Sequence, residues 1–174
     1  MIFWYILTLL AEPEYWGVIG VCFVALYLLL KKTPWGKKPG LKVFKKFVII
    51  FMISLFISFG IVQVLKLGLQ VPRICTPCPA PDCNSYCLPD YSFPSGHAAT
   101  AFVLFTSLYT VIRKKRFLPL FIVPILMSLS RIMLGVHTYT DVFAGALIGI
   151  LVTFGVWKKR GCLTAKTAKR LFGY

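Results

Sequence analysis

The sequence predicts an all-α fold: a polytopic transmembrane helix bundle that forms a single domain over residues 1–174. Two observations lead to this prediction. The chain is 58% hydrophobic and only 14% charged, whereas a soluble domain carries about 25% charged residues. Apolar runs of roughly 15 to 20 residues also recur along the chain, each bounded by charge or proline, which is the pattern of membrane-spanning helices.

The apolar runs place five spanning helices and one shorter helix before them. Residues 1–11 are apolar and aromatic but too short to cross the hydrocarbon at about 1.5 Å per residue, so they predict an interfacial or partly inserted helix. A basic loop broken by proline and glycine is expected over residues 31–46. In the fourth span, Pro119 and Pro124 are expected to bend the helix. The predicted spans are residues 15–30, 47–65, 95–112, 118–134 and 141–157.

The net charge of +15 points to a membrane surface and not to nucleic acid. Lysine and arginine cluster at the ends of apolar runs, over residues 31–46, 113–116 and 158–160, where they anchor helices and contact anionic lipid head groups. All three clusters fall on one side of the predicted topology, which the positive-inside rule makes cytoplasmic. The acidic residues fall at the other, outer side: Glu12, Glu14, Asp82, Asp90 and Asp141.

Residues 91–97, Tyr-Ser-Phe-Pro-Ser-Gly-His, lie where the third spanning helix should begin. A helix start exposes unpaired N–H groups and the positive end of the helix dipole, so it attracts anions. Ser95 is a favoured N-cap, and Gly96 lets a ligand oxygen approach the backbone closely. His97 falls in the first turn. In the alternative interpretation, Pro94, Ser95 and Gly96 only start the helix, and His97 is an ordinary polar residue with its hydrogen bonds satisfied near the membrane interface.

A second polar set lies at the outer ends of other helices. His137, the only other histidine, follows Arg131 by six residues and precedes Asp141 by four. On a helix Asp141 would share a face with His137 and fix its tautomer. The plain alternative is that it merely caps the helix, and both can be true. Lys66 and Arg73 are either phosphate clamps or ordinary interfacial anchors. Because five acidic residues serve twenty basic ones, Arg131 is expected to meet an anion from outside the protein.

Three motifs in this order resemble the signature motifs of the type 2 phosphatidic acid phosphatase (PAP2) family. They are Lys66-x6-Arg73, Pro94-Ser-Gly-His97 and Ser130-Arg131-x5-His137-x3-Asp141, and the resemblance covers roughly residues 47–157. In one departure, the first motif ends in Pro72-Arg73 where the family commonly has Arg-Pro.

The resemblance implies a six-helix bundle and a role for each motif residue. His137 would be the nucleophile that forms a phosphohistidine, with Asp141 orienting it. His97 would be the general acid for the leaving group. The phosphate oxygens would be bound by Lys66, Arg73, Ser95, the Gly96 amide and Arg131. No metal or other cofactor is expected.

The short chain resembles most the small bacterial members of the family. These act on lipid phosphates at the outer face of the inner (cytoplasmic) membrane, with the active site facing the periplasm or exterior. The resemblance favours a lipid A 1-phosphatase, and a phosphatidylglycerophosphate phosphatase or an undecaprenyl diphosphate phosphatase is the alternative. The expected partner is a membrane lipid phosphate.

Four cysteines in the outer loop, residues 74–90, are not part of the family motifs. They follow the pattern Cys75-x2-Cys78-x4-Cys83-x3-Cys87. An oxidising compartment favours two disulfides, with a metal site or free thiols as alternatives. They also motivate a rival function, a membrane thiol–disulfide oxidoreductase that works with a quinone. A non-catalytic lipid-binding or channel protein is a further alternative.

Overall fold

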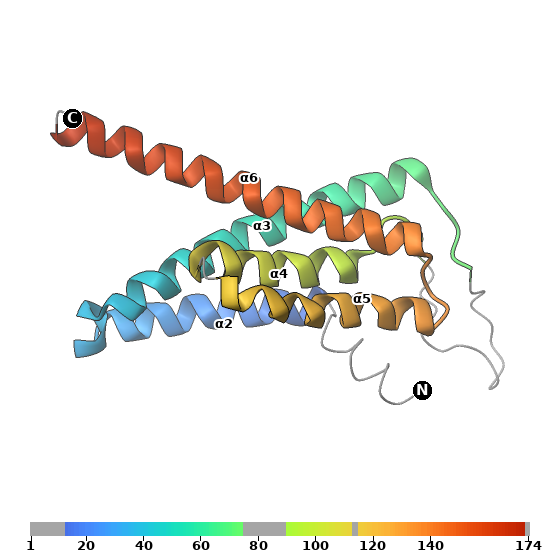
Figure 1. The fold of residues 1–174 in the computed structure, drawn as a ribbon, viewed down its shortest axis with the longest axis horizontal. Helices are drawn as coiled ribbons and strands as arrows, with labels where there is room; N and C mark the ends of the chain where they lie inside the picture. The colour runs from blue at the N-terminus through green and yellow to red at the C-terminus, as the bar shows by residue number, and fades with distance from the viewer. Residues whose placement is uncertain (1–12, 75–89, 113–114, 173–174) are drawn as a thin grey trace.

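The computed structural model describes residues 13–74, 90–112 and 115–172, and within these ranges every regular element is a helix (Figure 1). This confirms the predicted helical class. The predicted helix over residues 1–11 lies outside the described residues. The elements are α2 (Pro13–Lys31), the 3₁₀ helix η1 (Pro34–Lys37), α3 (Pro39–Leu69), α4 (Gly96–Ile112), the 3₁₀ helix η2 (Lys115–Phe121), α5 (Ile122–Met133) and α6 (Tyr139–Phe172).

Helix α4 lies at the centre of the bundle. It packs against α2, α3, α5 and α6, and most of its side chains are buried. The other helices run roughly along the long axis of the molecule, and α6 extends beyond them at its C-terminal end (Figure 1). The end of α3, the start of α4, the end of α5 and the start of α6 gather at one end of the bundle (Figure 1). This arrangement brings the motif-bearing helix ends together.

Among the residues that the structure describes, two helical segments are long and apolar enough to cross a membrane: Pro39–Leu69 and Tyr139–Arg160. The remaining predicted spans correspond to shorter apolar segments, Tyr15–Lys31, Gly96–Ile112 and Phe117–Met133. Large apolar side chains on the outer faces of α3 and α6 are mostly exposed, among them Phe56 at 70% and Phe143 at 71%. Such exposure is expected of surfaces that face lipid.

The predicted basic loop over residues 31–46 is wrong in its second half. Helix α3 begins at Pro39, so residues 39–46 are helical. Proline is favoured in the first helical turn, where its missing N–H has no partner to lose and its φ is already helical. The basic stretch at residues 158–160 is also helical, because α6 continues to Phe172 instead of ending at residue 157.

The predicted helix over residues 118–134 is divided in the structure. The chain forms the 3₁₀ helix η2 from Lys115 to Phe121, with Pro119 inside it, and α5 begins only at Ile122. Proline cannot donate the main-chain hydrogen bond of an α-helix interior. Pro124 is tolerated because it lies in the first turn of α5, where those N–H groups have no intrahelical partner.

Helices α4 and α6 approach each other closely at two glycines of α6. A Cβ atom on Gly145 would lie 2.3 Å from the carbonyl oxygen of Ser95, and one on Gly149 would lie 2.5 Å from that of Ala99. Small residues four apart on one face are a common device for close packing of membrane helices. The two glycines therefore fix how near the start of α6 lies to the start of α4.

Candidate active site

The end of α5 directs the chain towards the site. Gly135 has a left-handed φ of +69°, and its N–H donates to the Ile132 carbonyl at 2.9 Å. The N–H of Val136 donates to the Arg131 carbonyl at 3.1 Å. These two bonds form a Schellman motif, which needs glycine at the left-handed position. Arg131 in the last turn and His137 just beyond it are thus held at the same end of the bundle.

A reciprocal cap starts α6. The hydroxyl of Thr138 accepts a hydrogen bond from the Asp141 N–H at 3.2 Å, and Asp141 Oδ2 accepts one from the Thr138 N–H at 2.8 Å. This is a capping box with aspartate in the N3 position. The cap fixes the Asp141 carboxylate beside the residue that precedes Thr138, which is His137.

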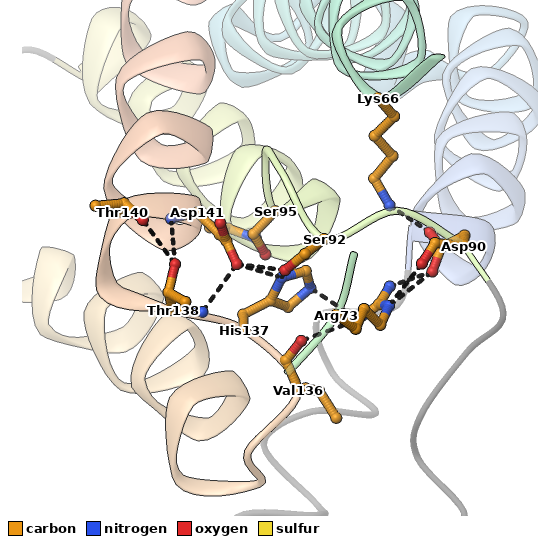
Figure 2. Close-up of polar contacts among 11 residues, drawn as sticks. Lys66, Arg73, Asp90, Ser92, Ser95, Val136, His137, Thr138, Thr140 and Asp141 are labelled. Atoms are coloured by element: carbon orange, nitrogen blue, oxygen red, sulfur yellow. Dashed lines mark hydrogen bonds and ion pairs between the residues drawn. The ribbon is translucent and has the colours of Figure 1, made fainter. Parts of the chain in front are cut away.

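His137 is contacted at both ring nitrogens (Figure 2). Its Nδ1 lies 3.4 Å from Asp141 Oδ2 and 3.3 Å from Ser92 Oγ. Its Nε2 lies 3.3 Å from Nη1 of Arg73. Because a guanidinium can only donate, Nε2 must accept, so in the neutral ring the proton is on Nδ1. The ring therefore presents a lone pair at Nε2.

Burial keeps the imidazole of His137 neutral. His137 is only 2% exposed. Burial, the principal cause, and the positive charges of Arg73 and Arg131 together lower its pKa to about 4, against the opposing effect of Asp141. At neutral pH the ring is therefore unprotonated at Nε2, whose lone pair faces Nη1 of Arg73.

Ser92 holds Asp141 from the other side, and sequence reasoning did not identify it. Its hydroxyl donates to Asp141 Oδ2 at 2.5 Å, and its main-chain N–H donates to the carbonyl of Val71 at 2.8 Å. Ser92 is 1% exposed. It therefore joins the segment after α3 to the carboxylate at the start of α6. No local signal in the sequence marks this serine, because its partners are far away along the chain.

Asp90 was also missed, although it binds both cations of the first motif. Its carboxylate forms ion pairs with Lys66 and Arg73 (Figure 2). Arg73 Nε donates to Asp90 Oδ1 at 2.9 Å, while its Nη1 donates to the carbonyl of Val136 at 3.2 Å. Burial opposes ionisation of Asp90, but its bonds to the two cations outweigh this and hold its pKa below the usual range.

Ser95 joins the starts of α4 and α6. Its N–H donates to the main-chain carbonyl of Asp141 at 3.0 Å, and its hydroxyl accepts from the N–H of Ala98 at 3.4 Å, as an N-cap does. Ser95 is fully buried. These bonds place His97, in the first turn of α4, next to the turn that carries His137.

A cavity of about 580 Å³ opens onto this polar cluster. Its walls are mainly apolar and come from α2 and α3, with Val21, Leu55 and Phe59 among them. Its polar end is formed by Lys66, Arg73, Asp90, Gly96, His97 and His137. An apolar cavity with a few convergent charged groups suits an amphiphilic ligand whose head group carries negative charge.

The family model of the PAP2 superfamily matches residues 47–162 of the chain. The chain belongs to the PAP2 superfamily. The resemblance stated from the three motifs is thereby confirmed, and it covers the helices that form the polar end of the cavity, α3 to α6.

Two curated proteins are similar to this PAP2 chain in sequence. Undecaprenyl-diphosphatase from Sulfolobus acidocaldarius is 30% identical over 137 residues, which are 78% of this chain and 61% of that protein. Human sphingosine-1-phosphate phosphatase 2 is 29% identical over 141 residues, which are 75% of this chain and 34% of that protein. The chain thus spans less than two thirds of the length of either relative.

Two solved structures share the PAP2 fold. A transmembrane PAP2-type phosphatidylglycerolphosphate phosphatase from Bacillus subtilis superposes with a TM-score of 0.64 at 21% identity, covering 91% of this chain and 75% of that one. LpxE from Aquifex aeolicus superposes with a TM-score of 0.57 at 26% identity, covering 90% and 93%. With the two membrane-length helices, these likenesses identify an integral membrane protein.

The structure brings residues of all three PAP2 motifs to one cavity end. Lys66 and Arg73 come from the first motif, Gly96 and His97 from the second, and His137 from the third. Asp141 lies behind His137, with Oδ2 against Nδ1. Ser95 and Arg131 are buried and are not among the residues that line the cavity.

The four cysteines of the outer loop lie outside the described residues, and no possible metal site is found among the residues that the structure describes. Cys75, Cys78, Cys83 and Cys87 lie outside the described residues, so their pairing as disulfides stays a prediction. Within the ranges that the structure describes, no three His, Cys, Asp or Glu side chains are grouped as a metal site would need. The cations at the polar end of the cavity are Lys66 and Arg73, side chains of the kind that bind phosphate oxygens.

Proposed function

We propose that this chain is a membrane lipid phosphatase that hydrolyses a phosphomonoester or diphosphate of a lipid through a phosphohistidine intermediate. The contacts of the two ring nitrogens of His137 support this proposal most strongly. Its Nδ1 faces the Asp141 carboxylate, and its Nε2 faces Arg73 at the polar end of an apolar cavity. A neutral imidazole with one nitrogen fixed by a carboxylate offers the other nitrogen as a nucleophile.

In the first step, Nε2 of His137 attacks the phosphorus of the substrate. The Nε2–P bond forms as the P–O bond to the lipid breaks, and the electron pair of that bond leaves on the lipid oxygen. His97, which lines the same cavity, donates a proton to that oxygen as general acid. The positive charge that develops on the His137 ring is stabilised by the Asp141 carboxylate.

In the second step, water hydrolyses the phosphohistidine. His97, now neutral, takes a proton from the water as its oxygen bonds to phosphorus. The P–Nε2 bond breaks, its electron pair returns to His137, and inorganic phosphate leaves. His137 is then neutral and His97 is protonated, as both were before the first step. His137 thus acts first as nucleophile and then as leaving group, and His97 acts first as general acid and then as general base.

Positive side chains supply the electrostatic stabilisation of the phosphoryl group. Lys66 and Arg73 line the cavity, and Arg131 lies near enough to His137 to lower its pKa. Fixed cations in a site shielded from water stabilise the charge of a transferring phosphoryl group, so the reaction needs no divalent metal. We infer phosphate-binding roles for these three residues and for Ser95 and the Gly96 amide at the start of α4.

The substrate is proposed to be a lipid because the cavity walls are apolar. The related proteins are named for phosphate groups on undecaprenyl, sphingosine and phosphatidylglycerol carriers. We take lipid A 1-phosphate as the first substrate to test, with phosphatidylglycerophosphate and undecaprenyl diphosphate as alternatives. The basic clusters at residues 31–46, 113–116 and 158–160 support a topology in the inner membrane with the catalytic end outside.

The proposal is tested by phosphate release from lipids in detergent micelles. The panel contains lipid A, phosphatidylglycerophosphate, phosphatidic acid and undecaprenyl diphosphate, each assayed with EDTA, with magnesium and with a thiol reductant. Release in EDTA that is absent in His137→Ala supports the proposal. Failure with every lipid, or activity that appears only with magnesium, rejects it. Quinone reduction without phosphate release would favour the oxidoreductase alternative.

A further inference from the structure

Asp90 occupies the two cations that a substrate phosphate is expected to use. Its Oδ2 pairs with Nζ of Lys66, and its Oδ1 pairs with the guanidinium of Arg73, so one carboxylate bridges both (Figure 2). A carboxylate and a phosphate present the same kind of oxygen pair to a guanidinium fork. In this arrangement Asp90 stands where two phosphate oxygens would bind.

The contacts of Arg73 show what the bridge does to the site. Its Nε bonds Asp90 Oδ1 at 2.9 Å and the Asp90 carbonyl at 3.2 Å. Its Nη1 lies 3.2 Å from the carbonyl of Val136 and 3.3 Å from Nε2 of His137. The edge of the guanidinium that would hold a phosphate is therefore filled, and an N–H covers the lone pair of the nucleophile. Substrate must displace these contacts before phosphorus can reach Nε2.

Burial indicates which partner moves. The side chains of Lys66 and Arg73 are 9% and 4% exposed, whereas that of Asp90 is 44% exposed. A carboxylate with this exposure can rotate away from the two cations towards solvent at low cost, because water then solvates its negative charge. The two buried cations cannot do so, and they need an anion in its place.

We propose that Asp90 is an internal competitor of the substrate phosphate and sets which anions the site accepts. This rests on the proposed function. A lipid phosphomonoester carries a charge of about −1.5 to −2 at neutral pH, so it outcompetes a single carboxylate for the two cations. A phosphodiester head group carries one negative charge and gains nothing over Asp90. The carboxylate thus keeps the abundant anionic phospholipids of the membrane out of the site.

The direct test is the affinity of the detergent-solubilised protein for inorganic phosphate, measured by calorimetry. In Asp90→Asn the internal anion is gone, and the dissociation constant should fall about 10-fold, as expected when a competing state that holds some nine tenths of the molecules is removed. Gln70→Lys is the matched control. It adds the same unit of positive charge at an exposed position at the end of α3, and should tighten phosphate binding less than 2-fold.

A second probe tests the selectivity. Micelles of phosphatidylglycerol, a phosphodiester, should compete with phosphate in Asp90→Asn and in Asp90→Ser, but not in the wild type or in Gln70→Lys. Phosphate affinity that is unchanged or weaker in both Asp90 variants would overturn the proposal, because Asp90 would then only hold the cations in place. Equal tightening in Gln70→Lys would also overturn it, as would absence of phosphate binding in every variant.

The binding assay separates this proposal from the proposed function. If the wild type releases phosphate from no lipid but Asp90→Asn still binds inorganic phosphate about 10-fold tighter, the phosphatase fails and the anion competition stands. If lipid phosphate is hydrolysed but the Asp90 variants bind phosphate and phosphatidylglycerol as the wild type does, the phosphatase stands and the competition fails.

Discussion

His137 is held 3.4 Å from Asp141, Nδ1 to Oδ2, by the turn that starts α6. The oxygen that faces the ring also accepts the N–H of Thr138 at 2.8 Å and the hydroxyl of Ser92 at 2.5 Å. A helix cap and a histidine-orienting carboxylate are therefore the same group. The sequence predicts capping, orientation of His137, or both for Asp141, and the geometry gives it both sets of contacts.

Replacing Asp141 should separate the two contributions. In Asp141→Asn an amide oxygen can still cap Thr138, but the charge that stabilises a positive His137 ring is lost, so kcat should fall about 10²- to 10⁴-fold, the range of a positioned acid–base group. Thr138→Ala removes only the hydroxyl cap and keeps the N–H, so it should cost about 1 kcal/mol of stability and leave kcat within a few-fold. Lipid phosphatase kinetics and thermal unfolding measure both. Equal losses of kcat in the two variants would mean that Asp141 only caps.

His137→Ala should abolish turnover and leave a folded protein that still binds phosphate. The residue supplies the proposed nucleophile, while Lys66 and Arg73 remain to bind the anion. Acid-labile phosphate on the protein, trapped by rapid quench with labelled substrate, is the measurement. It should appear in His97→Ala and never in His137→Ala. Labelling that persists without His137 would place the nucleophile elsewhere.

His97→Ala should impair the reaction in proportion to the need for a proton on the leaving group. His97 lines the cavity with His137, and a general acid matters little when the leaving oxygen is already a stable anion. The loss of kcat should be about 10²- to 10⁴-fold with a lipid alkyl phosphate and at least tenfold smaller with an aryl phosphate. Steady-state kinetics with both substrates checks this. An equal loss with both would assign His97 a role in binding.

The acid limb of the pH–rate profile should lie unusually low for a histidine nucleophile. The pKa of His137 is about 4, so its neutral form prevails at higher pH, and kcat/KM should fall as pH drops through about 4, not through 6.5. Burial is the main cause, and the charge of Arg73 adds to it. Arg73→Ala should therefore move the limb to higher pH. A limb near 6.5 in the wild type would contradict the buried, neutral ring.

The motif residues could be predicted from the sequence because their spacing is local. Arg131, His137 and Asp141 lie on one short segment, and the Schellman turn and capping box that hold them are built within it. Asp90 and Ser92 could not be assigned in the same way. Asp90 acts on Lys66, 24 residues away, and Ser92 on Asp141, 49 residues away. Such pairings depend on how the helix ends meet, which no local pattern encodes.

Helix positions were predicted better than helix ends. The apolar runs locate each predicted span, but they end at the expected edge of the hydrocarbon core. The helical backbone continues beyond that edge into charged segments. Helix α3 begins at Pro39 within a lysine-rich segment, and α6 continues past residues 158–160. In both cases the hydrogen bonds of the helix need no apolar side chain. Pro39 does not break the helix, because proline is favoured in a first turn.

The close approach of α4 and α6 predicts that Gly145 is needed for both stability and activity. Its substitution by alanine would place Cβ 2.3 Å from the Ser95 carbonyl, so the two helix starts must move apart. Overpacking of this kind costs about 1–3 kcal/mol. Because Ser95 also donates to the Asp141 carbonyl at 3.0 Å, the shift should separate His97 from His137 and lower kcat more than it raises KM. Gly155→Ala is the control, since a Cβ there meets nothing within 4 Å, and it should leave stability unchanged or slightly raised. Thermal unfolding and steady-state kinetics of the two variants test this prediction. If the glycines were needed only for helix flexibility, both substitutions would have the same effect.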